Sequence, residues 1–244
     1  MIKWFCVVIL AIPRILYSQI KLLIMNANPK KYSFERRYRV VRQTCLWISK
    51  VLRVDLNIIN KDIITKPHKN GRIYVSNHFN IFEAVIFICL SKKPLVFISK
   101  KENSKVPFLN THMKAIKTIC IDRESARQSL KCCKEAGLLA KNGVDIVLFA
   151  EGTRSKDGNV APFKAALPSI VHYSEAETVL LTMYQANYPL KWRWITYPKE
   201  KVYIKVFEPL PYSYYLENRK EFNVLTHDMV ADQLEKFKSE VNKL

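Results

Sequence analysis

Apolar residues follow two patterns along the chain: short continuous runs typical of buried strands, and longer segments with apolar residues at helical spacing, typical of amphipathic helices. From residue 56 onward the two kinds of segment alternate. The strand patterns cover residues 56–59, 73–75, 95–98, 118–121, 145–149, 179–184 and 202–207. The helical patterns cover residues 82–90, 125–141, 165–173 and 222–244. This alternation predicts an α/β domain with a mostly parallel central sheet flanked by helices.

The N-terminal segment is apolar but interrupted. Pro13 and Arg14 break its first apolar run, and Lys21 breaks the second. A membrane-spanning helix needs about 20 apolar residues, and no small-residue cleavage site of a signal peptide follows. We therefore predict an uncleaved helix in the membrane interface, with Arg14 and Lys21 reaching the headgroups. Its apolar face comprises Trp4, Ile9, Ile12, Leu16, Ile20 and Leu23. The alternative is a helix packed on the domain.

Residues 33–54 predict a second amphipathic helix with basic residues beside an apolar stripe. The arginines are Arg36, Arg37, Arg39 and Arg42, and the stripe is Val41, Cys45, Ile48 and Leu52. This pattern suits an anionic lipid surface, although a solvated face over a core stripe gives the same pattern. We divide the chain into an N-terminal amphipathic helical membrane-association segment, residues 1–54, and an α/β domain, residues 55–244.

The charge of the chain narrows the class of partner. Its 244 residues include 40 Lys and Arg against 21 Asp and Glu, a net charge of +19. Such an excess favours nucleic acid, an acidic membrane surface or a phosphorylated substrate. The six cysteines form no C-x-x-C pair. This argues against a disulfide framework or a zinc site and favours reduced core thiols in a cytosolic compartment.

A histidine and an acid stand where one strand pattern gives way to a helix. His78 follows the strand at 73–75, and Glu83 follows five residues later, in the first turn of the helix. The carboxyl ends of strands commonly present side chains to a ligand. Glu83 can fix one imidazole nitrogen and leave the other free to take a proton. The pair therefore predicts a general base, with a buried structural histidine as the alternative.

The strand at 145–149 ends in a second candidate block. Gly152 lets the backbone approach a ligand, and Arg154 offers a planar fork for phosphate. Thr153 can donate a hydroxyl hydrogen bond. Glu151 can accept from a substrate hydroxyl or orient Arg154. A polar turn of no special function would have the same composition.

The strand at 118–121 ends in Asp122 and Arg123, which places Arg123 near the same sheet edge. The alternative is an Asp-Arg ion pair at the start of the next helix. The remaining histidines have no acid at a comparable spacing and are predicted to be structural or surface residues. They are His68, His112, His172 and His227.

The three blocks together, over about residues 56–210, resemble the glycerolipid acyltransferase family, the PlsC-like 1-acylglycerol-3-phosphate acyltransferases. The family's first block is Asn-His followed by four residues and an acid, and it corresponds to residues 77–83. Its Ile-Asp-Arg triplet corresponds to residues 121–123. Its Phe-Pro-Glu-Gly-Thr-Arg-Ser corresponds to residues 149–155, with alanine in place of proline. Three departures stand out. Glu83 replaces the usual aspartate, Lys117 replaces a glycine before the second block, and residues 180–183 lack the proline of a fourth block.

The resemblance implies transfer of a fatty acyl group from acyl-CoA or acyl carrier protein to the free hydroxyl of 1-acylglycerol 3-phosphate, giving phosphatidic acid. His78 would be the base, held by Glu83, and backbone N–H groups at the start of the next helix would bind the oxyanion. The acceptor phosphate would be bound by the cations of the other blocks. These are Arg123, Arg154, and Lys100 or Lys101.

The same resemblance implies no cofactor and no metal, and it implies a membrane-associated enzyme on the cytoplasmic face, in contact with anionic lipids. Residues 191–194, with two tryptophans, are a further candidate for interfacial contact. The altered fourth block leaves another lysophospholipid or an amino-lipid open as acceptor. A non-catalytic basic protein that binds lipid or nucleic acid is the alternative of another class. No nucleic acid is expected, because the basic residues are spread along the chain and no recognised binding module occurs.

Overall fold

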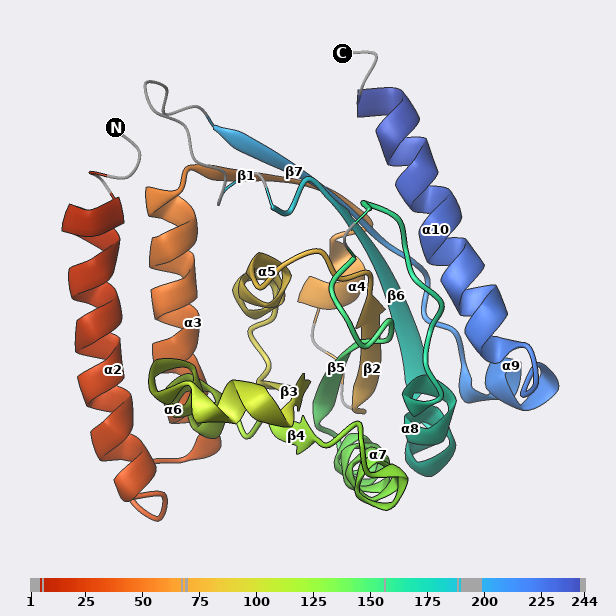
Figure 1. The fold of residues 1–244 in the computed structure, drawn as a ribbon, viewed down its shortest axis with the longest axis horizontal. Coiled ribbons are helices and arrows are strands. Elements are labelled where there is room, and N and C mark those ends of the chain that lie inside the picture. Colours follow the sequence, from red (N-terminus) through yellow and green to blue (C-terminus); the bar gives the residue numbers. More distant parts are fainter. Residues whose placement is uncertain are drawn as a thin grey trace.

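The computed structural model describes residues 5, 7–66, 68, 70–155, 157–187, 189 and 199–241. These residues form a seven-stranded sheet in the order β1-β7-β6-β2-β5-β3-β4, with helices on both faces (Figure 1). Every neighbouring pair is parallel except β6 and β7, which confirms the predicted fold class. The strands are β1 (Val54–Ile59), β2 (Arg72–Ser76), β3 (Leu95–Lys100), β4 (Ile119–Ile121), β5 (Asp145–Phe149), β6 (Glu177–Tyr184) and β7 (Glu200–Val206).

The helices cover the sheet in two groups. The group that includes α3 and α5 packs on one face, and α7, α8 and α10 pack on the other (Figure 1). The helical elements in chain order are η1 (Val7–Ala11), α2 (Ile12–Ala27), α3 (Phe34–Val51), α4 (Asp62–Thr65), α5 (Phe82–Leu90), η2 (Lys101–Lys105), α6 (Pro107–Ala115), α7 (Ala126–Lys141), α8 (Ala166–Ser174), α9 (Tyr212–Glu217) and α10 (Phe222–Val241).

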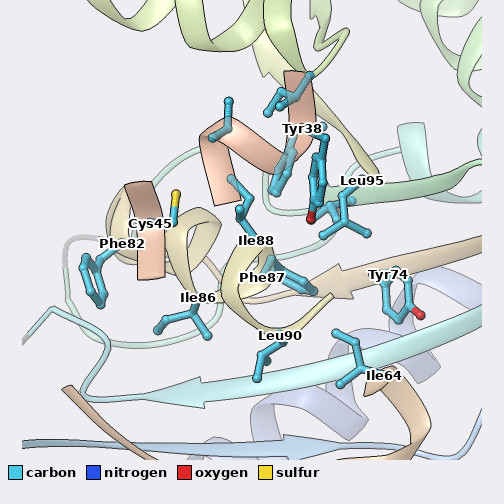
Figure 2. Packing of buried hydrophobic residues seen from close by; sticks show 14 of the residues in the cluster. Tyr38, Cys45, Ile64, Tyr74, Phe82, Ile86, Phe87, Ile88, Leu90 and Leu95 are labelled. Carbon is cyan, nitrogen blue, oxygen red and sulfur yellow. The ribbon is translucent and has the colours of Figure 1, made fainter. Parts of the chain in front are cut away.

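Strand β2 lies between two apolar clusters, one on each face of the sheet. Tyr74 belongs to the cluster under α3 and α5, whereas Ile73 and Val75 belong to the cluster under α7 and α8. Figure 2 shows part of the first cluster, including Tyr38 of α3, Phe87 of α5 and Tyr74. Alternate residues of a strand face opposite sides. This is why a strand buried on both faces has an unbroken apolar run.

The second predicted helix is shorter than expected. It ends at Val51, and β1 begins at Val54, where the prediction continued the helix. Arg53, in the turn between them, has a φ of 53°, a left-handed conformation that a continuing helix cannot contain. Helix α6 was not predicted from the sequence. It begins at Pro107, whose fixed φ suits the first position of a helix.

Helices α2 and α3 form an antiparallel hairpin (Figure 1). Trp47 Nε1 donates to the carbonyl of Leu10 near one end, and Arg37 donates to Asn26 Oδ1 near the other. The predicted lipid-facing role of the α3 arginines is wrong for two of them. Arg37 is buried, and Arg42 donates to the backbone carbonyls of Cys89 and Ser91 at the C-terminal end of α5. Arg36 and Arg39 are exposed.

Five of the six cysteines and the altered fourth block lie among the residues that the structure describes. Cys45, Cys132 and Cys133 are buried and free, as expected for reduced core cysteines. Thr182 of β6, in the altered fourth block, donates its hydroxyl to the carbonyl of Val230 in α10. This part of the fourth block therefore contacts α10. Residues 191–194 and 242–244 lie outside the described residues.

Candidate active site

Parallel pairing of β2 and β5 brings two of the predicted blocks to one sheet edge. Ser76 lies opposite Phe149 at the carboxyl ends of these strands. His78 follows β2 by two residues, and Glu151 follows β5 by two residues. Strands that run in the same direction end at the same edge, and the two blocks therefore come into direct contact.

The predicted pair of His78 and Glu83 is formed. Nδ1 of His78 lies 2.7 Å from Oε2 of the fully buried Glu83. The carboxylate also accepts from the backbone N–H groups of Phe79, at 2.8 Å, and Asn80, at 3.3 Å. In its ionised form the carboxylate of Glu83 can only accept, so the contact assigns the proton of a neutral imidazole to Nδ1 and leaves Nε2 as the acceptor nitrogen. Nε2 has no hydrogen-bond partner within the described part of the chain.

The electrostatics of this pair follow from its burial. Burial raises the pKa of Glu83, and the imidazole of His78 and the two backbone amides oppose that shift. The extra methylene of glutamate is accommodated, because the carboxylate reaches Nδ1 and the amides at once. The substitution for aspartate therefore does not prevent alignment.

The third block holds the backbone and the ring of His78. Oε1 of Glu151 accepts from the His78 N–H at 2.6 Å, and the Ser155 N–H donates to the His78 carbonyl at 2.8 Å. The imidazole stacks on Phe149, with ring centroids 4.2 Å apart and planes 19° apart. Sequence reasoning missed this stacking, since a phenylalanine at a strand end resembles any core residue.

Both carboxylate oxygens of Glu151 accept from backbone N–H groups, whereas the sequence predicted contact with a substrate hydroxyl or with Arg154. Its second oxygen accepts from the Ala161 N–H at 2.8 Å, and the residue is fully buried. Burial raises its pKa, against the pull of these two backbone N–H groups. Glu151 therefore positions His78 and the loop that begins after the block.

Asn77 is a further positioning residue that the sequence did not reveal. Its amide exchanges two hydrogen bonds with the backbone of Met183, donating to the carbonyl and accepting from the N–H, both at 2.8 Å. The pairing of β2 with β6 ends at Ser76 and Leu181. The side chain of Asn77 extends that pairing and fixes the position from which His78 projects.

The predicted oxyanion donors are occupied. The N–H groups of Phe79 and Asn80 donate to Glu83, and that of Phe82 donates to Asn80 Oδ1 at 2.6 Å. The prediction is wrong for these three N–H groups, because the carboxylate of Glu83 accepts from the first two and Asn80 Oδ1 accepts from the third. Nδ2 of Asn80 is buried and has no partner among the described residues.

Two cationic side chains lie over Gly152, whose φ is 73°. A Cβ built on this glycine would lie 3.4 Å from Cγ of Lys164 and 3.9 Å from Cζ of Arg123. Arg123, Arg154 and Lys164 are exposed, and none of them forms an ion pair with an acid among the described residues. Lys164 lies on the loop beyond the third block, and its N–H donates to the Ala150 carbonyl. The fold brings it to the site, and no local pattern marks it.

The other predicted cations differ in availability. Lys101 Nζ lies 2.6 Å from Asp122 Oδ2, and this contact raises the pKa of Lys101 and lowers that of Asp122. Asp122 therefore pairs with Lys101 and not with Arg123, contrary to the alternative drawn from the sequence. Lys100 lies 3.7 Å from Glu102 and is exposed. Thr153 is exposed.

A second histidine–carboxylate pair occurs at the opposite sheet edge. His68 Nε2 lies 2.9 Å from Oδ2 of the fully buried Asp145, at the start of β5. Asp145 also accepts from Lys93 Nζ at 2.9 Å and from the Arg72 N–H at 3.1 Å. His227 contacts the neighbouring Asp228 at 2.8 Å. Two of these histidines therefore have an acidic partner that their spacing in the sequence did not indicate.

Comparisons with known proteins find relatives named as acyltransferases. A 1-acyl-sn-glycerol-3-phosphate acyltransferase from Chlamydomonas reinhardtii is 30% identical over 128 residues, covering 52% of this chain and 38% of that protein. One from Borreliella burgdorferi is 26% identical over 148 residues, covering 61% and 59%. The matched part is thus less than two thirds of either relative.

The crystal structure of the 1-acyl-sn-glycerophosphate (LPA) acyltransferase PlsC from Thermotoga maritima has a similar fold. Its TM-score is 0.69 at 20% sequence identity, covering 97% of this chain and 93% of that one. Residues 56–184, from β1 to the end of β6, match the model of the family described as Acyltransferase. Since this match spans more than half of its length, the chain belongs to the Acyltransferase family.

Proposed function

We propose that this protein transfers a fatty acyl group from acyl-CoA or acyl carrier protein to the free hydroxyl of 1-acylglycerol 3-phosphate, giving phosphatidic acid. The observation that carries the proposal is the open Nε2 of His78, whose other nitrogen is fixed by buried Glu83, at the sheet edge that also bears Arg123 and Arg154. The names of the curated relatives support this acceptor.

The chemistry follows from the state of the histidine. His78 Nε2 takes the proton of the acceptor hydroxyl as that oxygen attacks the thioester carbonyl. Glu83 stabilises the imidazolium that forms. When the tetrahedral intermediate collapses, the C–S bond breaks, and the imidazolium returns the proton to the departing thiolate. No covalent acyl-enzyme is required.

The acceptor phosphate is bound by exposed cations near the end of β5 and the neighbouring strands. Arg123 and Lys164 lie over Gly152, where no side chain separates a ligand from the backbone. Arg154, two residues further on, supplies a second guanidinium able to bind phosphate at two oxygens. Lys100 is the more available of the two predicted lysines, because Lys101 is bound to Asp122.

The orientation of α2 supports membrane association. Five apolar residues of the predicted face are between 41% and 62% exposed: Ile9, Ile12, Leu16, Ile20 and Leu23. On the opposite side, Gln19 donates to the Thr111 hydroxyl and Asn26 to the Thr111 carbonyl. A helix with polar contacts to the protein and an outward apolar face is suited to lipid, because without lipid the apolar face would be exposed to water.

The segment Ile9–Ala27 is also long and apolar enough to cross a membrane, by length and composition alone. Core helices and signal sequences meet the same criterion. The polar contacts of α2 with the protein, together with Arg14 and Lys21 along its length, favour a helix lying in the membrane interface. We propose that this interface belongs to the cytoplasmic leaflet.

The test is acyl transfer by the purified full chain, with acyl-CoA and acyl carrier protein as donors. The acceptors are 1-acylglycerol 3-phosphate, lysophosphatidylcholine, lysophosphatidylglycerol and an amino-lipid. We expect kcat/KM to be highest for 1-acylglycerol 3-phosphate, whose dianionic phosphate suits several cations. Preferred acylation of another acceptor would overturn the acceptor assignment, and no transfer with any pair would overturn the proposal.

A further inference from the structure

A hollow on the α2–α3 hairpin combines cationic and aromatic side chains. Among the described residues it is lined by Arg14 and Tyr17 of α2 and Trp47 of α3, with a volume of about 360 Å³. The Trp47 indole N–H donates to the Leu10 carbonyl, which fixes one wall. The hollow lies on the hairpin, on elements that do not carry His78.

Two cations converge on Tyr17. Cζ of Arg14 lies 5.6 Å from the centre of its ring, and Nζ of Lys21 lies 5.5 Å from it and 3.4 Å from the phenolic oxygen. Nε of Arg14 is buried without a hydrogen-bond partner in the described structure. A buried N–H that lacks an acceptor costs free energy until a ligand supplies one.

The hairpin has almost no acid to neutralise these cations. Helix α2 contains no Asp or Glu, and the one acid of α3 is Glu35, in the first turn at the far end from Trp47. The surroundings are apolar, since Leu10, Leu16 and Leu46 are each at least 40% exposed. An occupant must therefore be anionic at one end and apolar at the other.

We propose that this hollow is a binding site for the phosphate of an anionic phospholipid headgroup, separate from the acceptor site at His78. Arg14 donates side-on to the phosphate, Lys21 adds a second charge, and Tyr17 and Trp47 pack on the glycerol region. The inference rests on the proposed membrane association of α2 and adds a particular lipid contact to it. Guanidinium suits this role because it binds phosphate through two parallel N–H groups.

The test is vesicle flotation of the full chain with phosphatidylcholine alone and with added phosphatidylglycerol. We expect Arg14→Ala to weaken binding to anionic vesicles about fivefold, the usual effect of one basic residue at a membrane surface. Arg14→Lys keeps the charge and loses the fork, and it should also weaken binding. Neither change should alter binding to phosphatidylcholine alone.

Arg36 provides a matched control, since its Cζ lies 5.1 Å from the centre of the Tyr32 ring, a similar pair outside the hollow. Arg36→Lys should bind as the wild type does. The inference is overturned if Arg14→Lys also binds as the wild type does, which would indicate charge alone, or if inorganic phosphate competes as well as lipid does. Failure of the wild type to bind any vesicle would instead refute the proposed membrane association.

Discussion

The two ends of β2 and β5 each hold a histidine against a buried carboxylate, and the two pairs differ in how the histidine ring is bound. At the carboxyl end, Glu83 holds Nδ1 of His78 and leaves Nε2 open. At the amino end, Asp145 accepts from His68 and from Lys93, whose ammonium also donates to the Asn70 carbonyl. The amino-end pair joins loops around the start of β5.

The difference shows that a paired histidine is not in itself a catalytic one. Nδ1 of His68 lies 3.4 Å from the Lys66 carbonyl, so both of its ring nitrogens face protein acceptors. His78 has one nitrogen committed and one free, on a ring held by Phe149. We therefore expect changes at the carboxyl end to alter rate and changes at the amino end to alter stability.

The largest expected effect separates the two histidines. His78→Ala should lower kcat/KM by about a thousandfold, the usual contribution of a general base, with little change in the midpoint of urea unfolding. His68→Ala is the control and should lower that midpoint while retaining most of the activity of the folded protein. Equal activity of His78→Ala and the wild type would remove the proposed mechanism.

Removal of the amino-end acid should act on stability alone. Asp145→Ala removes the charge partner of the Lys93 ammonium and the acceptor of the Arg72 N–H, and we expect a loss of about 3 kcal/mol in the free energy of unfolding. Urea denaturation measures it. Asp145→Asn, which keeps an acceptor oxygen, should lose less. If the folded Asp145→Ala protein had a much lower kcat, the two ends of the sheet would not be separate in function.

Loss of the carboxyl-end acid should act on rate first. Glu83→Gln removes the charge that stabilises the imidazolium and can present an amide N–H to Nδ1, favouring the wrong tautomer. We expect kcat to fall about a hundredfold while KM for the acceptor changes little. Glu83→Asp is the informative companion, because it restores the residue usual in the resembled family. A higher KM for the acceptor without loss of kcat would instead assign Glu83 a role in substrate binding.

The parts of the site that are local in sequence were predictable. His78 and Glu83 are one strand-to-helix turn apart, and the strand patterns that place Arg123 and Arg154 at one edge are strongly apolar. Contacts between distant segments were not predictable. The role of Glu151 depends on the backbone of residue 78, and Lys164 reaches Gly152 through the path of a loop. The oxyanion prediction failed for a related reason, since periodicity does not show which acceptor claims a backbone N–H.

The smallest expected effect concerns Lys117, which replaces the glycine usual before the second block and precedes β4 at the amino end of the sheet. Its φ of 53° is in the left-handed region, which costs a residue with a Cβ about 1 kcal/mol. Its ammonium lies 4.9 Å from the centre of the Phe34 ring, a contact worth about 0.5–1 kcal/mol. Lys117→Gly relieves the backbone strain and loses the contact with Phe34. The free energy of unfolding should therefore change by less than about 1 kcal/mol. Lys117→Ala keeps the strain and loses the contact, and it should be the less stable of the two. Both should retain the wild-type kcat/KM, and a tenfold loss in Lys117→Gly would show that the amino end also governs rate.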